Sequence, residues 1–300
     1  MLQTRSGRKR RKRYGGILGK AAGRLTAFCV LLAFGIVICL PVGLLLSGSI
    51  TGAYEMHEML LPMLQKGDAF IAWKWLPEFP DFSGYGKLLF STPQFFVLFW
   101  NSVKITGLIL LGQLAVAVPA AWAFAVYPIP FKKVLFTGYI VLMLLPFQVT
   151  MLSQYLVLDR NGLLNTHWAI ILPAVFSTFP VFLIYRSFSQ LPESLLEAAR
   201  IDGAGEWYAF FHIGLPLTEG GILSAMILNF LECWNLIEQP LAFLKERSLW
   251  PLSLYLPQIG LEQAGFAMTA SVITLLPALC IFAFGQDYLE QGISASGIKE

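Results

Sequence analysis

A periodic set of polar side chains interrupts one apolar stretch of this chain. Asn229, Glu232 and Asn235 recur every three residues, so a helix places them along one inclined side, with Trp234 beside them. Carboxylate and amide groups hydrogen-bond hydroxyl groups, and an indole offers a flat face to a sugar ring. These four residues are therefore candidates for lining a substrate pathway. The alternative is a structural polar contact between helices.

Glu232 is the most costly of these residues if the stretch crosses a membrane. A carboxylate at the centre of a membrane-spanning helix costs about 2.5–3.5 kcal/mol, and less near an end. We therefore expect Glu232 to face water or the interior of a helix bundle. Gln113, in another apolar stretch, is a candidate for a second polar contact inside such a bundle.

The elements that would position these side chains are membrane-spanning helices. Of the 300 residues, 56% are hydrophobic and 13% are charged, and the mean hydropathy is +0.66. Soluble domains carry about 25% charged residues, so the composition indicates an all-α integral membrane protein. A span needs about 20 apolar residues. Six predicted spans meet this need: 25–46, 95–126, 134–158, 168–186, 217–237 and 266–287.

The first 24 residues set the expected orientation. Nine of the 21 lysines and arginines lie in 1–24, directly before an uncharged stretch. Basic residues before a span hold that end in the cytoplasm, which we prefer to a nucleic-acid-binding arm, so no nucleic acid partner is expected. Six spans, in one transmembrane domain (25–290), return the tail (291–300) to the cytoplasm. The alternative of a cleaved signal peptide conflicts with an apolar run longer than the usual 7–15 or so residues.

The segment between the fourth and fifth spans, residues 187–216, is long and polar for a simple turn. Its first half, LPESLLEAARIDGAG, is typical of a short amphipathic helix. Pro192 suits the first helical turn, and Glu193 complements the positive end of the helix dipole. Gly203 and Gly205 are expected to end the helix and let the chain turn.

The small residues of this helix favour a close contact. Ala198 and Ala199 would let a partner surface approach the backbone, whereas the alternatives are a helix on the lipid surface or a packing element of the bundle. After the helix, Pro216 is expected to restart a helix into the fifth span.

One residue pattern in this segment resembles a family signature. It reads Glu-Ala-Ala, three residues, Gly, nine residues, Ile, one residue, Leu-Pro. Every fixed position matches: Glu197, Ala198, Ala199, Gly203, Ile213, Leu215 and Pro216. The stretch resembles the signature loop of permease subunits of binding-protein-dependent ABC importers. The sequence FFVLFWNSVKITG resembles the start of the family's membrane core, and WNLIEQPLAFL is similar to a segment common in its sugar permeases. The tail QGISASGIKE resembles the ending of the smaller maltose-permease partner, although Ile293 and Ser294 replace Leu and Thr and Glu300 replaces the final Gly.

This resemblance implies a type I ABC importer permease fold, with six spans and a cytoplasmic coupling helix between spans four and five. In the family this helix docks into a cleft on the ATP-binding subunit and transmits closure of the ATPase dimer to the spans. Carried over to this chain, the coupling contacts are Glu197, Ala198, Ala199, Asp202 and Gly203.

The resemblance also implies partners and a place in the cell. These are a second homologous permease forming a heterodimer, two ATP-binding subunits and an extracytoplasmic solute-binding protein. The implied substrate is a sugar or oligosaccharide. The implied location is the bacterial inner membrane, surrounded by lipid, with both termini in the cytoplasm.

The chain lacks the residues needed to use ATP itself. It contains no G-x-x-x-x-G-K-[ST] phosphate loop, so ATP and Mg are expected at the partner ATPases and no cofactor on this chain. His57, His167 and His212 are far apart in sequence, and the four cysteines show no metal or disulfide spacing. We therefore predict no metal site, no catalytic residue and no enzyme activity.

Three alternatives stay open at this point. A permease of the same family for another solute, such as a polyamine or glycerol phosphate, keeps every feature except the substrate. An ion-coupled secondary transporter would work without an ATPase, and the signature loop argues against it. A purely structural membrane scaffold would not need Gly203 or the Ala198–Ala199 pair.

Overall fold

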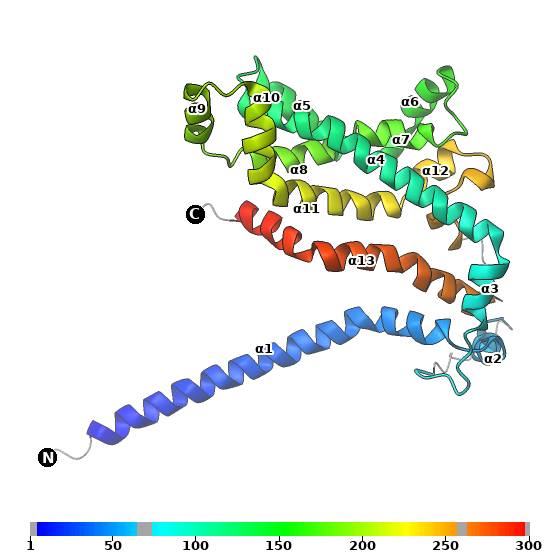
Figure 1. The fold of residues 1–300 in the computed structure, drawn as a ribbon. Helices are drawn as coiled ribbons and strands as arrows, with labels where there is room; N and C mark the ends of the chain where they lie inside the picture. Colours follow the sequence, from blue (N-terminus) through cyan, green and yellow to red (C-terminus); the bar gives the residue numbers. More distant parts are fainter. Residues whose placement is uncertain (1–4, 65–73, 257–262, 298–300) are drawn as a thin grey trace. The chain divides into compact units, whose positions relative to one another are not determined.

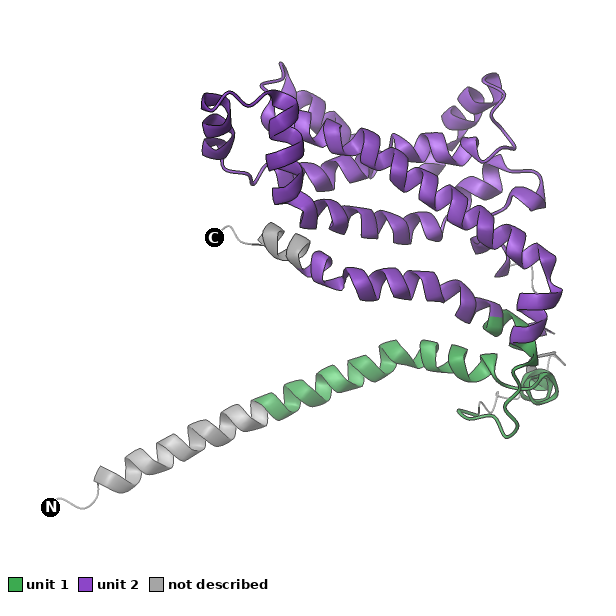
Figure 2. Ribbon diagram, in the orientation of Figure 1, with its two compact units in different colours: residues 1–84, 264–269 green, residues 85–263, 270–300 purple. Residues whose placement is uncertain are grey.

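The computed structural model describes residues 5–64, 74–256 and 263–297. Helices make up nearly all of this part of the chain, and no strand is assigned within it apart from one isolated bridge between Thr51 and Pro80. Figure 2 shows the two compact units into which the chain divides, which are described separately: residues 1–84 with 264–269, and residues 85–263 with 270–300.

Five helices in the described residues are long and apolar enough to cross a membrane, and six spans result if one bent helix pair counts as a span. The helices of the chain are α1 (Arg5–Ser49), α2 (Ala53–Leu64), α3 (Ser83–Ser91), α4 (Pro93–Val126), α5 (Lys132–Leu144), α6 (Phe147–Arg160), α7 (Trp168–Val175), α8 (Thr178–Phe188), α9 (Glu193–Ile201), α10 (Glu206–Ala209), the π-helical turn η1 (Phe210–Gly214), α11 (Leu215–Trp234), α12 (Glu238–Phe243) and α13 (Ala264–Gly297), with short 3-10 turns at Arg247–Leu249 and Leu252–Leu254.

The first unit joins the end of α1 to α2 and to the first turn of α13. Met56, Met59 and Leu60 of α2 form a small buried cluster against α13, and the Thr269 hydroxyl donates a hydrogen bond to the Ser49 carbonyl at 3.1 Å. In the described residues between α2 and α3, Trp75, Phe79 and Phe82 are exposed. Exposed aromatics of this kind are typical of a membrane–water interface.

The second unit is a bundle around α4, α8 and α11, which contact one another pairwise. Figure 1 shows α9 and α10 at one end of these three helices and α6 and α12 at the opposite end. Small residues such as Ala117, Ala121 and Ala225 are buried where the helices meet, and small side chains let membrane helices approach closely.

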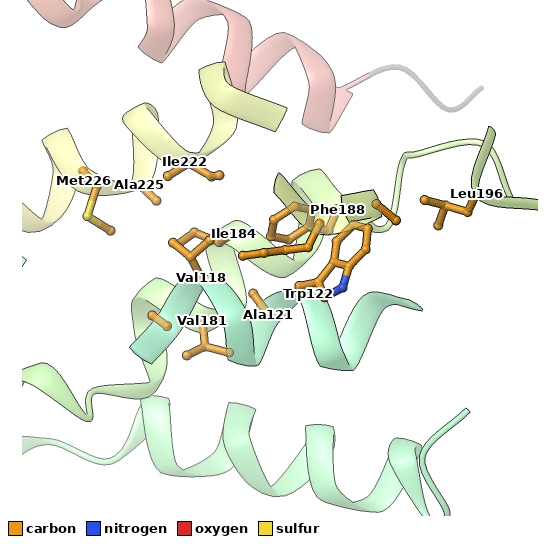
Figure 3. Close-up of a cluster of buried hydrophobic side chains, with 13 residues drawn as sticks. Val118, Ala121, Trp122, Val181, Ile184, Phe188, Leu196, Ile222, Ala225 and Met226 are labelled. Atoms are coloured by element: carbon orange, nitrogen blue, oxygen red, sulfur yellow. The ribbon is translucent and has the colours of Figure 1, made fainter. Parts of the chain in front are cut away.

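A cluster of apolar side chains fills the α9 end of this bundle (Figure 3). The ring centroid of Trp122 of α4 lies 5.2 Å from that of Phe188 of α8 and 5.5 Å from that of Phe210 of η1. Leu196 of α9 and Ile222 of α11 belong to the same cluster. Side chains from α4, α8, α9, η1 and α11 therefore share one packed cluster.

The third predicted span, 134–158, is not one continuous helix. It consists of α5 and α6, which are bent by 99° at a short break. Pro146 provides the physical reason, because proline has no N–H for the helical hydrogen bond and pushes the preceding residue out of the α region. Leu145 is accordingly extended, with φ −71° and ψ 124°.

The fourth span covers Trp168–Phe188, and its backbone is interrupted in the middle. α7 ends before Phe176, and Ser177 is extended with φ −59° and ψ 143° before α8 begins. Pro180 occupies the first turn of α8, where a missing N–H costs little.

The fifth span begins earlier than the sequence predicted. A helix does not restart at Pro216; it begins at Glu206 and runs through η1 into α11, so that the candidate span is Glu206–Trp234. The reason is the π-helical turn before the proline, in which the Leu215 N–H bonds the Phe210 carbonyl. The helix continues past Pro216 through this wider turn without a break.

The remaining candidate spans are Arg24–Ser49, Pro93–Val126 and Ala264–Glu290. They overlap the predicted stretches 25–46, 95–126 and 266–287. α13 continues to Gly297, so most of the predicted tail is helical, and residues 298–300 lie outside the described part of the chain.

Candidate functional site

A cavity of about 630 Å³ lies within the second unit, a size typical of small-molecule sites. Its lining comes from helices α4 to α8, α11 and α12 and from the breaks between them. The polar lining residues are Gln113, Thr150, Gln154, Ser177, Thr178, Asn229, Glu232 and Gln239, and the aromatic ones are Phe147, Phe176, Phe179 and Phe243.

Both interrupted spans contribute their breaks to this cavity. Leu145, at the bend between α5 and α6, lines it, as do Phe176 and Ser177 between α7 and α8. Within a bilayer, non-helical backbone is tolerated where it is buried in protein or lines a water-filled cavity. Broken helices around a polar cavity are characteristic of transport proteins.

Gln113 is the most deeply buried polar residue of the lining, with 1% of its surface exposed. Its Nε2 donates a 3.0 Å hydrogen bond to the carbonyl of Ala174, in the last turn of α7. Because a carbonyl needs a donor, this contact fixes the amide orientation. Oε1 of Gln113 then has no hydrogen-bond partner among the described residues.

Two of the four predicted pathway residues line the cavity. Asn229 is buried and donates from Nδ2 to the Ala225 carbonyl at 2.9 Å. Glu232, one turn further along α11, is exposed in this chain. The three-residue spacing therefore brings an amide and a carboxylate to the same cavity.

The other two predicted pathway residues lie elsewhere. Trp234 is buried, its indole N–H donates to the Thr274 carbonyl at 3.1 Å, and its ring stacks on Phe230. Asn235 is exposed and bonds the Leu231 carbonyl of its own helix. Neither is part of the cavity lining.

Sequence reasoning missed Gln154 and Gln239, which line the cavity from α6 and α12. Both are single amides near the ends of apolar stretches, and only the bend at Pro146 brings α6 to this place. Gln113 did carry a signal, because it is a polar residue inside an otherwise apolar span.

The predicted coupling residues lie on α9 and the turn after it. Glu197, Ala198, Asp202 and Gly203 are exposed, whereas Ala199 is buried together with Leu196 on the inner side of the helix. α9 therefore turns Leu196 and Ala199 to the bundle, whereas the other four predicted coupling residues are exposed.

The C-terminal turn of α9 is closed by two backbone hydrogen bonds. The Gly203 N–H bonds the Arg200 carbonyl at 3.1 Å, and the Ala204 N–H bonds the Ala199 carbonyl at 2.9 Å. Gly203 has φ +82°. This pattern is a Schellman motif, which requires a left-handed residue and hence favours glycine.

Side chains also connect α9 to the bundle. Arg200 forms an ion pair with Glu206 at 3.3 Å, and the other carboxylate oxygen of Glu206 accepts a 3.1 Å hydrogen bond from Tyr127. Both charged groups are half exposed, so the pair is worth about 1 kcal/mol or less. Its effect is to orient the turn rather than to hold the fold.

At the opposite end, polar side chains hold the segment after α12. The Asn165 amide accepts from the Lys245 and Glu246 N–H groups at 2.9 and 3.0 Å, and Asn101 donates to the Trp250 carbonyl at 3.0 Å. His167 contacts the Leu249 carbonyl at 3.1 Å. Burial lowers the pKa of His167 below its ordinary value. The hydrogen bond with the Leu249 carbonyl raises this pKa in part, and the positive charge of Lys104 lowers it further.

Several apolar spans and a polar cavity between broken helices are typical of a polytopic membrane protein that transports a solute. Residues 113–295, more than half of the chain, match the family described as "Binding-protein-dependent transport system inner membrane component". The chain therefore belongs to this family, and the resemblance seen in the segment from Glu197 to Pro216 is confirmed.

Curated relatives support the same family. The arabinooligosaccharides transport system permease protein AraQ of Halalkalibacterium halodurans is 31% identical over 204 residues, covering 67% of this chain and 73% of the relative. The maltose/maltodextrin transport system permease protein MalG of Escherichia coli K12 is 31% identical over 226 residues, covering 70% and 75%.

A solved structure shares the fold. The crystal structure of a bacterial ABC transporter involved in the import of the acidic polysaccharide alginate aligns with a TM-score of 0.70 and 22% identity, over 93% of this chain and 98% of that chain. The type I ABC permease fold expected from the sequence is thereby confirmed.

Proposed function

We propose that this chain is the translocation subunit of an ATP-driven importer for a sugar or oligosaccharide. It pairs with a second, homologous permease and with two ATP-binding subunits, which hold ATP and Mg, and it receives solute from an external binding protein. The family description and the arabinooligosaccharide and maltose relatives support this proposal. A polyamine or glycerol phosphate has no comparable support among these relatives.

One observation carries the proposal: α9 and the turn after it expose four of the five predicted coupling residues, while Leu196 on the inner side of α9 belongs to the packed cluster of the spans. Leu196 lies in the same cluster as Trp122 of α4 and Phe188 of α8. Packed cores rearrange between discrete states rather than deform continuously. A partner that moves α9 therefore shifts the spans that surround the cavity.

The orientation follows from the same assignment. The α9 end of the bundle is cytoplasmic, where ATP is available, and the α6 and α12 end faces the binding protein. The basic N-terminal run agrees with this choice. With α5 and α6 counted as one span, six spans place both termini in the cytoplasm, in a bacterial inner membrane.

Copurification tests the partner assignment. With the chain tagged and its neighbouring genes coexpressed, we expect an ATPase to copurify with the wild type. Glu197→Lys and Ala198→Trp should lower its recovery at least about tenfold, because both change the exposed side of α9. The matched control is Asp159→Lys, an exposed acid-to-lysine change on α6 at the other end of the bundle. Equal recovery in all variants would remove α9 from the interface.

Glu232→Ala tests the pathway assignment. Hydrogen bonds to a charged group are worth about 1.5–3 kcal/mol, so the substrate concentration for half-maximal uptake should change about tenfold or more. ATPase recovery should stay at the wild-type level, since Glu232 is remote from α9 in the sequence and lines the cavity. Glu219→Ala, on the same helix but outside the lining, serves as the control. Unchanged uptake in Glu232→Ala would leave this residue a structural role.

A further inference from the structure

The charges around the cavity separate two kinds of sugar. Among the described residues that line it, Glu232 is the only one with a formal charge at neutral pH, and none is lysine, arginine or histidine. The other polar lining groups are hydroxyls and amides. A carboxylate-bearing solute would find no cation here, whereas a hydroxyl-bearing solute would find acceptors and donors.

Gln113 adds an acceptor that the protein itself leaves unused. Its Nε2 is committed to the Ala174 carbonyl, and its buried Oε1 has no partner among the described residues. A buried acceptor without a donor is costly. Oε1 is itself enclosed, so a solute reaches it only when side chains of the lining move aside. A hydroxyl donor would then satisfy it, whereas a carboxylate, which only accepts, would not.

The apolar part of the lining suits the same solute. Four phenylalanines lie around the polar groups: Phe147, Phe176, Phe179 and Phe243. Aromatic walls with a few placed polar groups are typical of small-molecule sites. A sugar ring combines C–H faces with a hydroxyl rim, so it matches both parts of this surface.

We propose that this cavity binds a neutral sugar unit and discriminates against uronic acids. This inference rests on the proposed function. Gln113 and Asn229 bond the hydroxyls of the sugar, and Glu232 accepts from hydroxyls while repelling a carboxylate. Dehydrating a second anion without a nearby cation adds to that repulsion. The fold alone does not decide the charge of the solute, because it is shared with an importer of an acidic polysaccharide.

Paired ligands that differ only in their carboxylates test this proposal. The complex of permeases and ATPases, without binding protein, is placed in lipid nanodiscs. Binding is measured with radiolabelled maltotriose and its C6-oxidised tri-uronate, and with α-1,4-galactotriose and trigalacturonate. We expect at least one neutral member to bind, at least about tenfold more tightly than its uronate.

Substitutions assign the discrimination to Glu232. Glu232→Gln keeps the shape and should reduce the preference to about threefold or less, and Glu232→Lys should reverse it. Asn235→Lys places a lysine at the C-terminal end of the same helix, at an exposed residue outside the lining, and it should leave the preference unchanged. Size-exclusion profiles confirm that each variant complex is intact.

The outcomes separate this proposal from the proposed function. Equal or tighter binding of the uronates by the wild type overturns the neutral-sugar assignment, and so does a preference that Glu232→Lys leaves intact. Binding of no member of either pair, by a complex that still contains its ATPases, also overturns it while the importer assignment stands. A chain that copurifies with no ATPase contradicts the proposed function itself.

Discussion

Replacing Gly203 with proline is expected to lower ATP-driven uptake at least about a hundredfold while the chain remains in the membrane. Gly203 has φ +82°, and proline is restricted to about −65°. Proline also lacks the N–H that Gly203 donates to the Arg200 carbonyl. Both losses fall on the turn that closes α9, so the exposed signature residues should lose their arrangement.

A graded pair isolates the backbone conformation as the cause. Gly203→Ala keeps the N–H, and the left-handed backbone conformation at residue 203 then costs about 1–2 kcal/mol. Uptake should therefore fall but not vanish. Gly205→Ala is the matched control, because Gly205 has φ −72° and no atom within 4 Å of an added Cβ. Uptake and ATPase recovery are measured for all three variants. Normal uptake by Gly203→Pro would show that this turn has no coupling role.

The short helix α9 could be predicted well because its signals are local. Pro192 immediately precedes it, Glu193 begins it and Gly203 follows it with a positive φ. Each signal acts through the backbone of neighbouring residues, so no tertiary information is needed. Helical spacing also places Ala199 on the same face as Leu196, and both are buried on the inner side of α9.

The breaks in the spans could not be predicted from proline positions. Pro119 and Pro277 lie inside continuous helices, whereas Pro146 separates α5 from α6 by a sharp bend. All three stand in similar apolar surroundings in the sequence. Whether a proline is absorbed or ends a helix depends on the neighbouring groups that satisfy the freed backbone, and these come from other helices.

The candidate pathway shows the same limit. The spacing of Asn229 and Glu232 places both at the cavity, because helical periodicity is local. Trp234 faces α13 instead, where its N–H bonds the Thr274 carbonyl, 40 residues further along the chain. The three-residue spacing on α11 carries no information about a partner so distant in the sequence.

The second large effect is expected from Gly214→Val, in the π-helical turn. A Cβ at Gly214 would lie 2.4 Å from a ring carbon of Trp122, far closer than atoms in contact allow. Trp122 cannot easily move, because its ring is packed against Phe188 and Phe210. Overpacking typically costs about 1–3 kcal/mol and occasionally more. We expect a lower thermal midpoint of the purified complex, by several degrees, and loss of uptake.

A double variant distinguishes a steric conflict from a general weakening of the helix. Trp122→Leu removes the ring that meets the new side chain, so it should restore part of the stability lost in Gly214→Val. Gly107→Val, on the same helix as Trp122 and with no atom within 4 Å of its Cβ, controls for valine in a helix. Additive losses in the double variant would contradict the steric explanation. Partial rescue of both stability and uptake would instead establish that the steric conflict between residue 214 and the Trp122 ring caused both losses.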